Sequence, residues 1–145
     1  MKILGHPVHI MLIHFPSALF PMDLVCSAIS YYSGDSSFTE ASFYAMSGGV
    51  ILGWIAVIFG TFDLLNVFEK KPEAMNKALV HGCINVTVVI IYTVLAYIQY
   101  KHYPLLQPDN MLLLIIKAVT IGLMIVGNFI GGSLILKHKV AVENE

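Results

Sequence analysis

The sequence predicts an all-α integral membrane protein, an antiparallel four-helix bundle with up-down-up-down topology. Three observations predict this class. The chain of 145 residues is 57% hydrophobic and only 12% charged, whereas soluble domains carry about 25% charged residues. Its mean hydropathy is +0.79. Four apolar stretches are each long enough to cross a hydrocarbon core of about 30 Å, which takes about 20 helical residues.

The four predicted spans follow one another through short connections, so we expect residues 1–145 to form a single membrane domain. The spans are residues 10–32, 41–68, 78–100 and 110–136. None of them alternates polar and apolar residues as a half-buried strand does. Turn-forming residues stand between them at Ser33-Gly34-Asp35, at Lys71-Pro72 and at Gln107-Pro108-Asp109. Short connections make neighbouring helices antiparallel.

The distribution of lysines predicts the orientation in the membrane. Four spans place both termini and the second connection on one side. That side holds Lys2, Lys70, Lys71, Lys77, Lys137 and Lys139. Because lysine-rich loops face the cytoplasm, we expect both termini to be cytoplasmic. The chain has a net charge of -1 and no arginine, so the lipid bilayer is the expected partner and nucleic acid is not.

Lys117 lies about two turns inside the fourth span, where a charged side chain is costly. In one interpretation its flexible side chain extends to the outer interface, which is the commoner arrangement. In the other interpretation it is buried as the partner of Asp23 or of an anion such as a haem propionate.

Five of the six histidines gather on the predicted cytoplasmic side. They are His6, His9 and His14 at the start of the first span, His81 early in the third, and His138 after the fourth. A single histidine of this kind usually bonds a backbone carbonyl, but five from three segments predict a binding site. His102 lies in the opposite loop. Pro16 lacks a backbone donor and can bend the first span beside His14.

Other polar and small residues occur near these histidines. We expect Asp63, on the second span, and Asn85, one turn after His81, to orient the imidazole rings by hydrogen bonds. Small residues also recur along one face of two spans, at Gly49, Gly53, Ala56 and Gly60 and at Gly127 and Gly131. They either let the helices pack closely or leave room for a flat macrocycle.

The opening Gly5-His6-Pro7-Val8-His9, followed by Ile13-His14-Phe15-Pro16, resembles the GHPLHPxLVxFP opening of the DUF2231 family of bacterial membrane proteins. The resemblance continues through Asp23, Gly60 with Asp63, His81 with Asn85, and Gly131-Gly132 before His138. The sequence departs from the family at Ile10, at Asn128-Phe129 and at Lys139. The resemblance implies a four-helix domain of the bacterial inner membrane with no settled activity. Similar domains occur beside Rieske-type iron–sulfur domains, which implies an iron–sulfur redox partner.

The histidines allow two kinds of cofactor. In the first hypothesis, the protein is a b-type haem protein for electron transfer, in which His81 ligates haem b opposite His9 or His14. His6 and His138 then bind a second haem or the haem propionates. In the second hypothesis, a zinc or iron ion for sensing, storage or transport is bound by a cluster of nitrogen ligands, His6, His9, His81 and His138, together with Asp63.

A third hypothesis is a structural membrane subunit without a cofactor. A hydrolase is not expected, because no serine or cysteine stands plausibly beside a histidine and an acid. An electron carrier or a binding protein is therefore expected rather than an enzyme. The number of cofactors, the pairing of the histidines and the oligomeric state, a homo-oligomer included, stay open.

Overall fold

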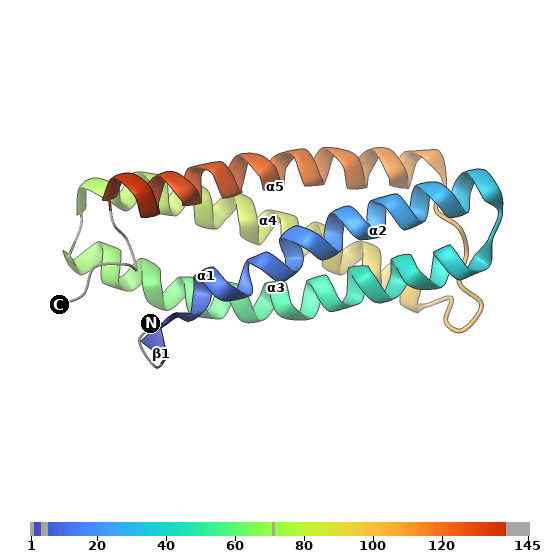
Figure 1. Ribbon diagram of the computed structural model, residues 1–145, viewed down its shortest axis with the longest axis horizontal. Helices are drawn as coiled ribbons and strands as arrows, with labels where there is room; N and C mark the ends of the chain where they lie inside the picture. Colours follow the sequence, from blue (N-terminus) through green and yellow to red (C-terminus); the bar gives the residue numbers. More distant parts are fainter. Residues whose placement is uncertain (1, 4–5, 71, 139–145) are drawn as a thin grey trace.

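The structure, a computed structural model, describes residues 2–3, 6–70 and 72–138. The described elements are β1 (Lys2–Ile3), β2 (His6–Pro7), α1 (Val8–Leu12), α2 (His14–Ser33), α3 (Ser36–Lys70), the short 3-10 helix η1 (Pro72–Ala74), α4 (Met75–Tyr100) and α5 (Met111–His138). The long helices alternate in direction, and β1 and the end of α5 lie at the same end of the bundle (Figure 1). This end is called the histidine end below.

The predicted four-helix membrane bundle is confirmed. Four helical segments have the length and apolar composition to cross a membrane: Val8–Ser33, Ser36–Glu69, Pro72–Tyr100 and Met111–Lys137. Among the described residues, the one departure from an all-α chain is the antiparallel pair of β1 with β2, which precedes the first helix and has Ile3 opposite His6. Pro7 has no backbone N–H, and the helix starts directly after it at Val8.

The second span begins earlier than the apolar pattern indicates, at residue 36 instead of residue 41. The carboxylate of Asp35 accepts a hydrogen bond from the backbone N–H of Ser37 at 2.9 Å. This is the arrangement of a helix N-cap, and it allows a polar first turn. At 1.5 Å per residue, the 35 residues of α3 span roughly 52 Å, so the helix extends beyond an apolar core of about 30 Å.

The first span is interrupted at Ile13, as the position of Pro16 indicates. Pro16 has no N–H to donate to the carbonyl of Leu12, four residues earlier. Helical bonding continues on either side, from Ile13 N–H to the His9 carbonyl at 3.1 Å and from Ser17 N–H to the Ile13 carbonyl at 3.2 Å. The short helix α1 packs against α3, and this packing brings His9 to the second span.

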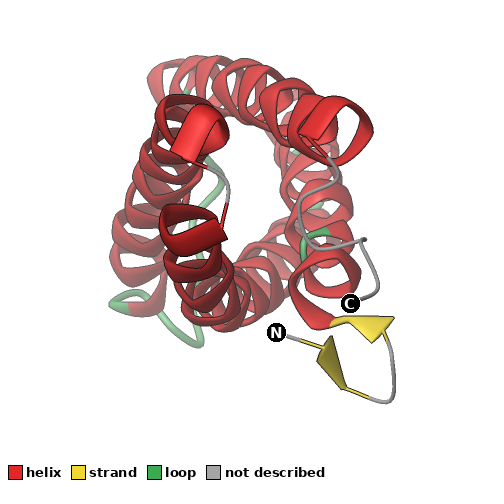
Figure 2. Cartoon of the chain, turned by 90° about the vertical axis from the view of Figure 1, so that its left-hand side faces the viewer, coloured by secondary structure: helices red, strands yellow, loops and turns green. Residues whose placement is uncertain are grey.

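The four long helices form a closed ring, in which α2 packs on α3, α3 on α4, α4 on α5, and α5 on α2 (Figure 2). The middle of the bundle is filled by a core that includes Phe20, Met46 and Tyr92, all fully buried. The rings of Phe20 and Tyr92 stack in parallel at 3.8 Å. A smaller apolar cluster of Val67, Ala74, Ala78 and Leu134 lies closer to the histidine end.

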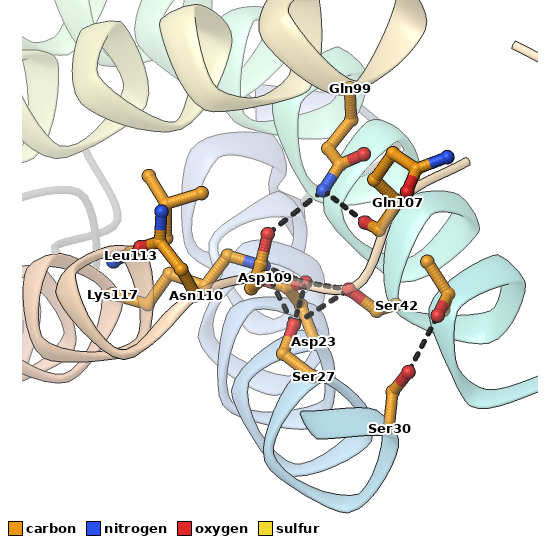
Figure 3. Close-up of polar contacts among 11 residues, drawn as sticks. Asp23, Ser27, Ser30, Ser42, Gln99, Gln107, Asp109, Asn110, Leu113 and Lys117 are labelled. Atoms are coloured by element: carbon orange, nitrogen blue, oxygen red, sulfur yellow. Dashed lines mark hydrogen bonds and ion pairs between the residues drawn. The ribbon is translucent and has the colours of Figure 1, made fainter. Parts of the chain in front are cut away.

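The opposite end of the bundle holds a polar cluster (Figure 3). Lys117 is 1% exposed, and its Nζ lies 2.7 Å from Asp23 Oδ1 and 2.6 Å from Asp109 Oδ2. The interpretation that Lys117 extends to the interface is therefore wrong, and its burial as the partner of Asp23 is confirmed. Asp23 is itself completely buried. Its ion pair with Lys117 therefore holds the lysine ammonium group inside the bundle.

Candidate functional site

A large cavity lies between the two apolar clusters, toward the histidine end. Its volume is about 760 Å³, and all four spans contribute to its walls. Ligand pockets of proteins typically range from about 300 to 1,000 Å³ and are mostly apolar with a few polar groups. Apolar side chains such as Phe20, Val88 and Met124 form one part of the wall, and His9, His14 and His81 form another.

His9 enters this cavity from α1 in a fixed orientation. Its Nδ1 lies 2.9 Å from the backbone carbonyl of Ala56 on α3. A carbonyl oxygen only accepts hydrogen bonds, so Nδ1 carries the hydrogen. The other ring nitrogen, Nε2, then keeps its lone pair and is the nitrogen that could ligate a metal.

His81 on α4 repeats this arrangement with a different helix. Its Nδ1 lies 2.8 Å from the carbonyl of Gly127 on α5, so the hydrogen is again on Nδ1 and the lone pair on Nε2. The amide nitrogen of Asn85 lies 3.1 Å from the same Nδ1. Since both nitrogens are donors, the Asn85 amide instead donates to the backbone carbonyl of His81 at 2.9 Å.

Glycines make room for both rings. A Cβ atom at Gly60 would lie 2.9 Å from Cε1 of His9, and a Cβ atom at Gly131 would lie 2.6 Å from Cε1 of His81. In each case the histidine bonds the carbonyl four residues before the glycine that it contacts, Ala56 for Gly60 and Gly127 for Gly131. Close packing against a side chain other than histidine occurs earlier in α3, where Gly49 faces the ring of Phe20.

The two imidazoles lie close to each other inside the cavity. Their ring centres are 6.3 Å apart, and their planes are nearly perpendicular, at 84°. The two imidazoles belong to opposite pairs of helices, and each has one ring nitrogen held by a backbone carbonyl.

The remaining predicted site residues are placed less completely. His14 lines the cavity and is exposed, and Asp63 lines it and is buried. His6 is in β2 and His138 is the last residue of α5, but their side chains lie outside the described part of the chain. The involvement of these two histidines stays a prediction. His102 lies in the exposed turn after α4, away from the cavity.

A site with several ligands for a zinc or iron ion is not formed by the described residues. Within the part of the chain that the structure describes, no three His, Cys, Asp or Glu side chains are grouped to hold a metal ion. His9 and His81 come together as a pair, and a bare metal ion usually needs about four protein or solvent ligands.

Sequence reasoning missed several polar residues at the opposite end of the bundle. Asp109 was interpreted as a turn residue because it follows Pro108, yet its side chain is buried against Lys117. Gln99, at the end of α4, donates to the other carboxylate oxygen of Asp109 at 2.8 Å. The spacing of Asp23, Ser27 and Ser30 along one face of the first span is a signal that could have located this cluster.

The chain belongs to the DUF2231 family of predicted membrane proteins, because the family model matches residues 5–144. No curated protein matched the chain in the corresponding comparison. No solved structure matched it either.

Proposed function

We propose that this protein is a membrane-embedded b-type haem protein for electron transfer, in which His9 and His81 would hold haem b through their Nε2 atoms. The observation that supports this proposal is the spacing of the two rings. A metal–imidazole bond is about 2.0 Å long and the ring centre lies about 1.2 Å behind the nitrogen, so two imidazoles on opposite sides of one metal have centres roughly 6.4 Å apart. The separation in the structure is 6.3 Å.

The surroundings of the two rings also fit a haem. The cavity of about 760 Å³ is lined mostly by apolar side chains, and a porphyrin is a large apolar ring. Each Nδ1–H bond to a carbonyl holds its ring in place and increases the basicity of Nε2. Bound haem supplies reversible one-electron chemistry at iron. The protein would hold both axial positions, which leaves none for a substrate.

Haem propionates are anionic and require cations or water nearby. Lys77 lies four residues before His81 on the same face of α4, and Lys137 is exposed near the end of α5. These lysines would pair with the propionates at the histidine end. Asp63 would help to orient a histidine from the cavity wall, whereas Asn85 bonds the backbone carbonyl of His81.

The family resemblance favours the bacterial inner membrane, and the lysine distribution supports an orientation with the histidine end, and hence both termini, on the cytoplasmic side. An electron partner at that face, such as an iron–sulfur protein, fits the proposal. A reporter that is active only in the periplasm should be inactive when it is fused after Glu145. Strong activity of that fusion would contradict the orientation.

The absorption spectrum of the purified protein, before and after reduction with dithionite, tests the cofactor. We expect a sharp α band on reduction in the wild-type protein. His9→Ala and His81→Ala should each lose this band while the protein still inserts in the membrane. His102→Ala changes an exposed histidine at the other end and should keep the full haem content.

Two results would overturn the haem proposal. A protein without haem bands that contains stoichiometric zinc or iron by elemental analysis would be a divalent metal-binding protein. A protein with neither haem nor metal after expression with haem precursors and iron would be a structural subunit without a cofactor.

A further inference from the structure

We propose that Asp23, Asp109 and Lys117 form a buried proton-binding site, in which the two carboxylates together hold one proton at neutral pH. The three side chains come from α2, from the loop before α5, and from α5 (Figure 3). Lys117 Nζ lies 2.7 Å from Asp23 and 2.6 Å from Asp109. This site is independent of any cofactor at the histidine end.

The charges of the cluster do not balance when all three groups are ionised. Two carboxylates and one ammonium leave one net negative charge, and the exposed fractions are 0% for Asp23, 5% for Asp109 and 1% for Lys117. An uncompensated charge buried within a membrane is strongly unfavourable. One bound proton makes the cluster neutral.

Among the residues that the structure describes, the groups that contact the cluster supply no second positive charge. Hydroxyl groups come from Ser27 on α2 and Ser42 on α3, which both contact Asp23 Oδ1. From α4 come the amide of Gln99, which bonds Asp109, and the phenol of Tyr92, which is completely buried in the core. All of these groups are neutral at pH 7.

Unused acceptor atoms in the cluster are the second observation. The donors Lys117, Ser42 and Ser27 all approach Oδ1 of Asp23, at 2.7, 2.5 and 3.3 Å. By contrast, Oδ2 of Asp23 and Oε1 of Gln99 are buried without a hydrogen-bond partner among the described residues. A carboxyl proton adds a donor to a site that has acceptors to spare.

The position of the lysine favours a proton over a metal cation. Its ammonium group already lies between the two carboxylates, where a metal ion would have to bind. The path of a proton between Asp109 and water is short, because Asp109 is flanked by the exposed residues Pro108 and Asn110. A proton from water at that surface adds to a carboxylate oxygen; no other bond breaks and no electron moves.

Infrared spectroscopy of the purified protein in lipid at pH 7 tests the site. We expect the wild-type protein to show the C=O stretch of a protonated carboxyl group, shifted in D2O. Asp109→Asn should lose this band, because Asp23 and Lys117 then form a neutral ion pair. Asp35→Asn, which changes an exposed carboxylate, should keep it.

Two further variants make the outcome decisive. Asp23→Asn should lose the same band, so it replaces Asp109→Asn if that variant fails to fold. Lys117→Met should increase the band roughly twofold, because both buried carboxylates then take up a proton. A wild-type spectrum that matches the Asp109→Asn and Asp23→Asn spectra in this region would overturn the proposal and leave only an ion pair.

Discussion

The two ends of the bundle both contain buried polar groups, but the hydrogen-bond and ion-pair partners of these groups differ. At the end opposite the histidine end, which holds Asp23, Asp109 and Lys117 and is called the loop end below, charged side chains contact one another directly, and Lys117 lies between two carboxylates. At the histidine end, His9 and His81 bond backbone carbonyls and face a cavity of about 760 Å³. The polar side chains therefore contact one another at the loop end, whereas at the histidine end the polar side chains line a cavity.

The difference lies in where the hydrogen-bond partners come from. The ion pairs at the loop end use side chains for both partners, so removal of Lys117 leaves two buried carboxyl groups without their cation. Each histidine uses a carbonyl that already accepts within a helix, and one ring nitrogen keeps its lone pair. Changes at the loop end should therefore affect mainly stability, and changes at the histidine end should affect mainly cofactor binding.

Lys117→Met should have the largest effect on stability. Removal of one partner from a buried ion pair typically costs about 3–5 kcal/mol, and two carboxylates lose their cation here. Unfolding of the detergent-solubilised protein, followed by circular dichroism, measures the loss. Lys101→Met changes an exposed lysine that lies 5.9 Å from the ring of Tyr97 and should cost no more than about 0.5 kcal/mol. Equal stability of the two variants would show that the loop-end cluster does not stabilise the bundle.

Gly131→Ala should have the largest effect at the histidine end apart from the histidine substitutions. The new Cβ would lie 2.6 Å from Cε1 of His81, so the ring must leave its position. We expect a loss of most of the haem with membrane insertion intact. The neighbouring Gly132 has open space around it, and Gly132→Ala should bind haem normally. Equal haem content in the two variants, measured by pyridine haemochrome absorption, would argue against His81 as a ligand.

Asp63→Asn should have a smaller effect on the same site. If Asp63 orients a ligand histidine, the loss of its charge should weaken haem binding about 10- to 100-fold. Haem titration of the apoprotein measures this change. Glu69→Gln, at an exposed position farther along α3, is the control. An unchanged haem affinity of Asp63→Asn would show that Asp63 lines the cavity without orienting a ligand histidine.

Asp35→Asn should have the smallest effect on stability, and this effect should depend on pH. Hydrogen bonds from the hydroxyl and the backbone N–H of Ser37 lower the pKa of this exposed carboxyl below its usual 3.8. A carboxyl group whose pKa is lowered in the folded state stabilises the protein at pH values above the unfolded-state pKa. This stabilisation is lost as the pH falls through the folded-state pKa. Wild type should therefore melt slightly above Asp35→Asn at pH 7, and the difference should vanish near pH 2. A constant difference would contradict the capping role of Asp35.

The sequence predicted the spans and the histidine end because both depend on local signals. Long apolar runs and lysine-rich connections are readable without knowledge of contacts. The partners of each side chain were less predictable. Nothing local indicates that His9 bonds Ala56 while His81 bonds Gly127, because these contacts join residues 47 and 46 positions apart.

The loop end was the least predictable region. Lys117 and Asp23 are 94 residues apart, and either side chain alone fits an interfacial position. Asp109 precedes the helix start at Met111 and has the sequence context of a turn. Burial of these residues depends on the register between α2 and α5, which apolar periodicity does not determine.

The stacked rings of Phe20 and Tyr92 lie between the two polar regions of the bundle. Phe20 stands between His14 and Asp23 along α2, and Tyr92 stands between His81 and Gln99 along α4. Both rings are completely buried, and their centres are 3.8 Å apart. A charge that moved from one polar region to the other would have to pass this apolar stack, and moving one elementary charge across a membrane potential changes the energy by about 2.3 kcal/mol per 100 mV.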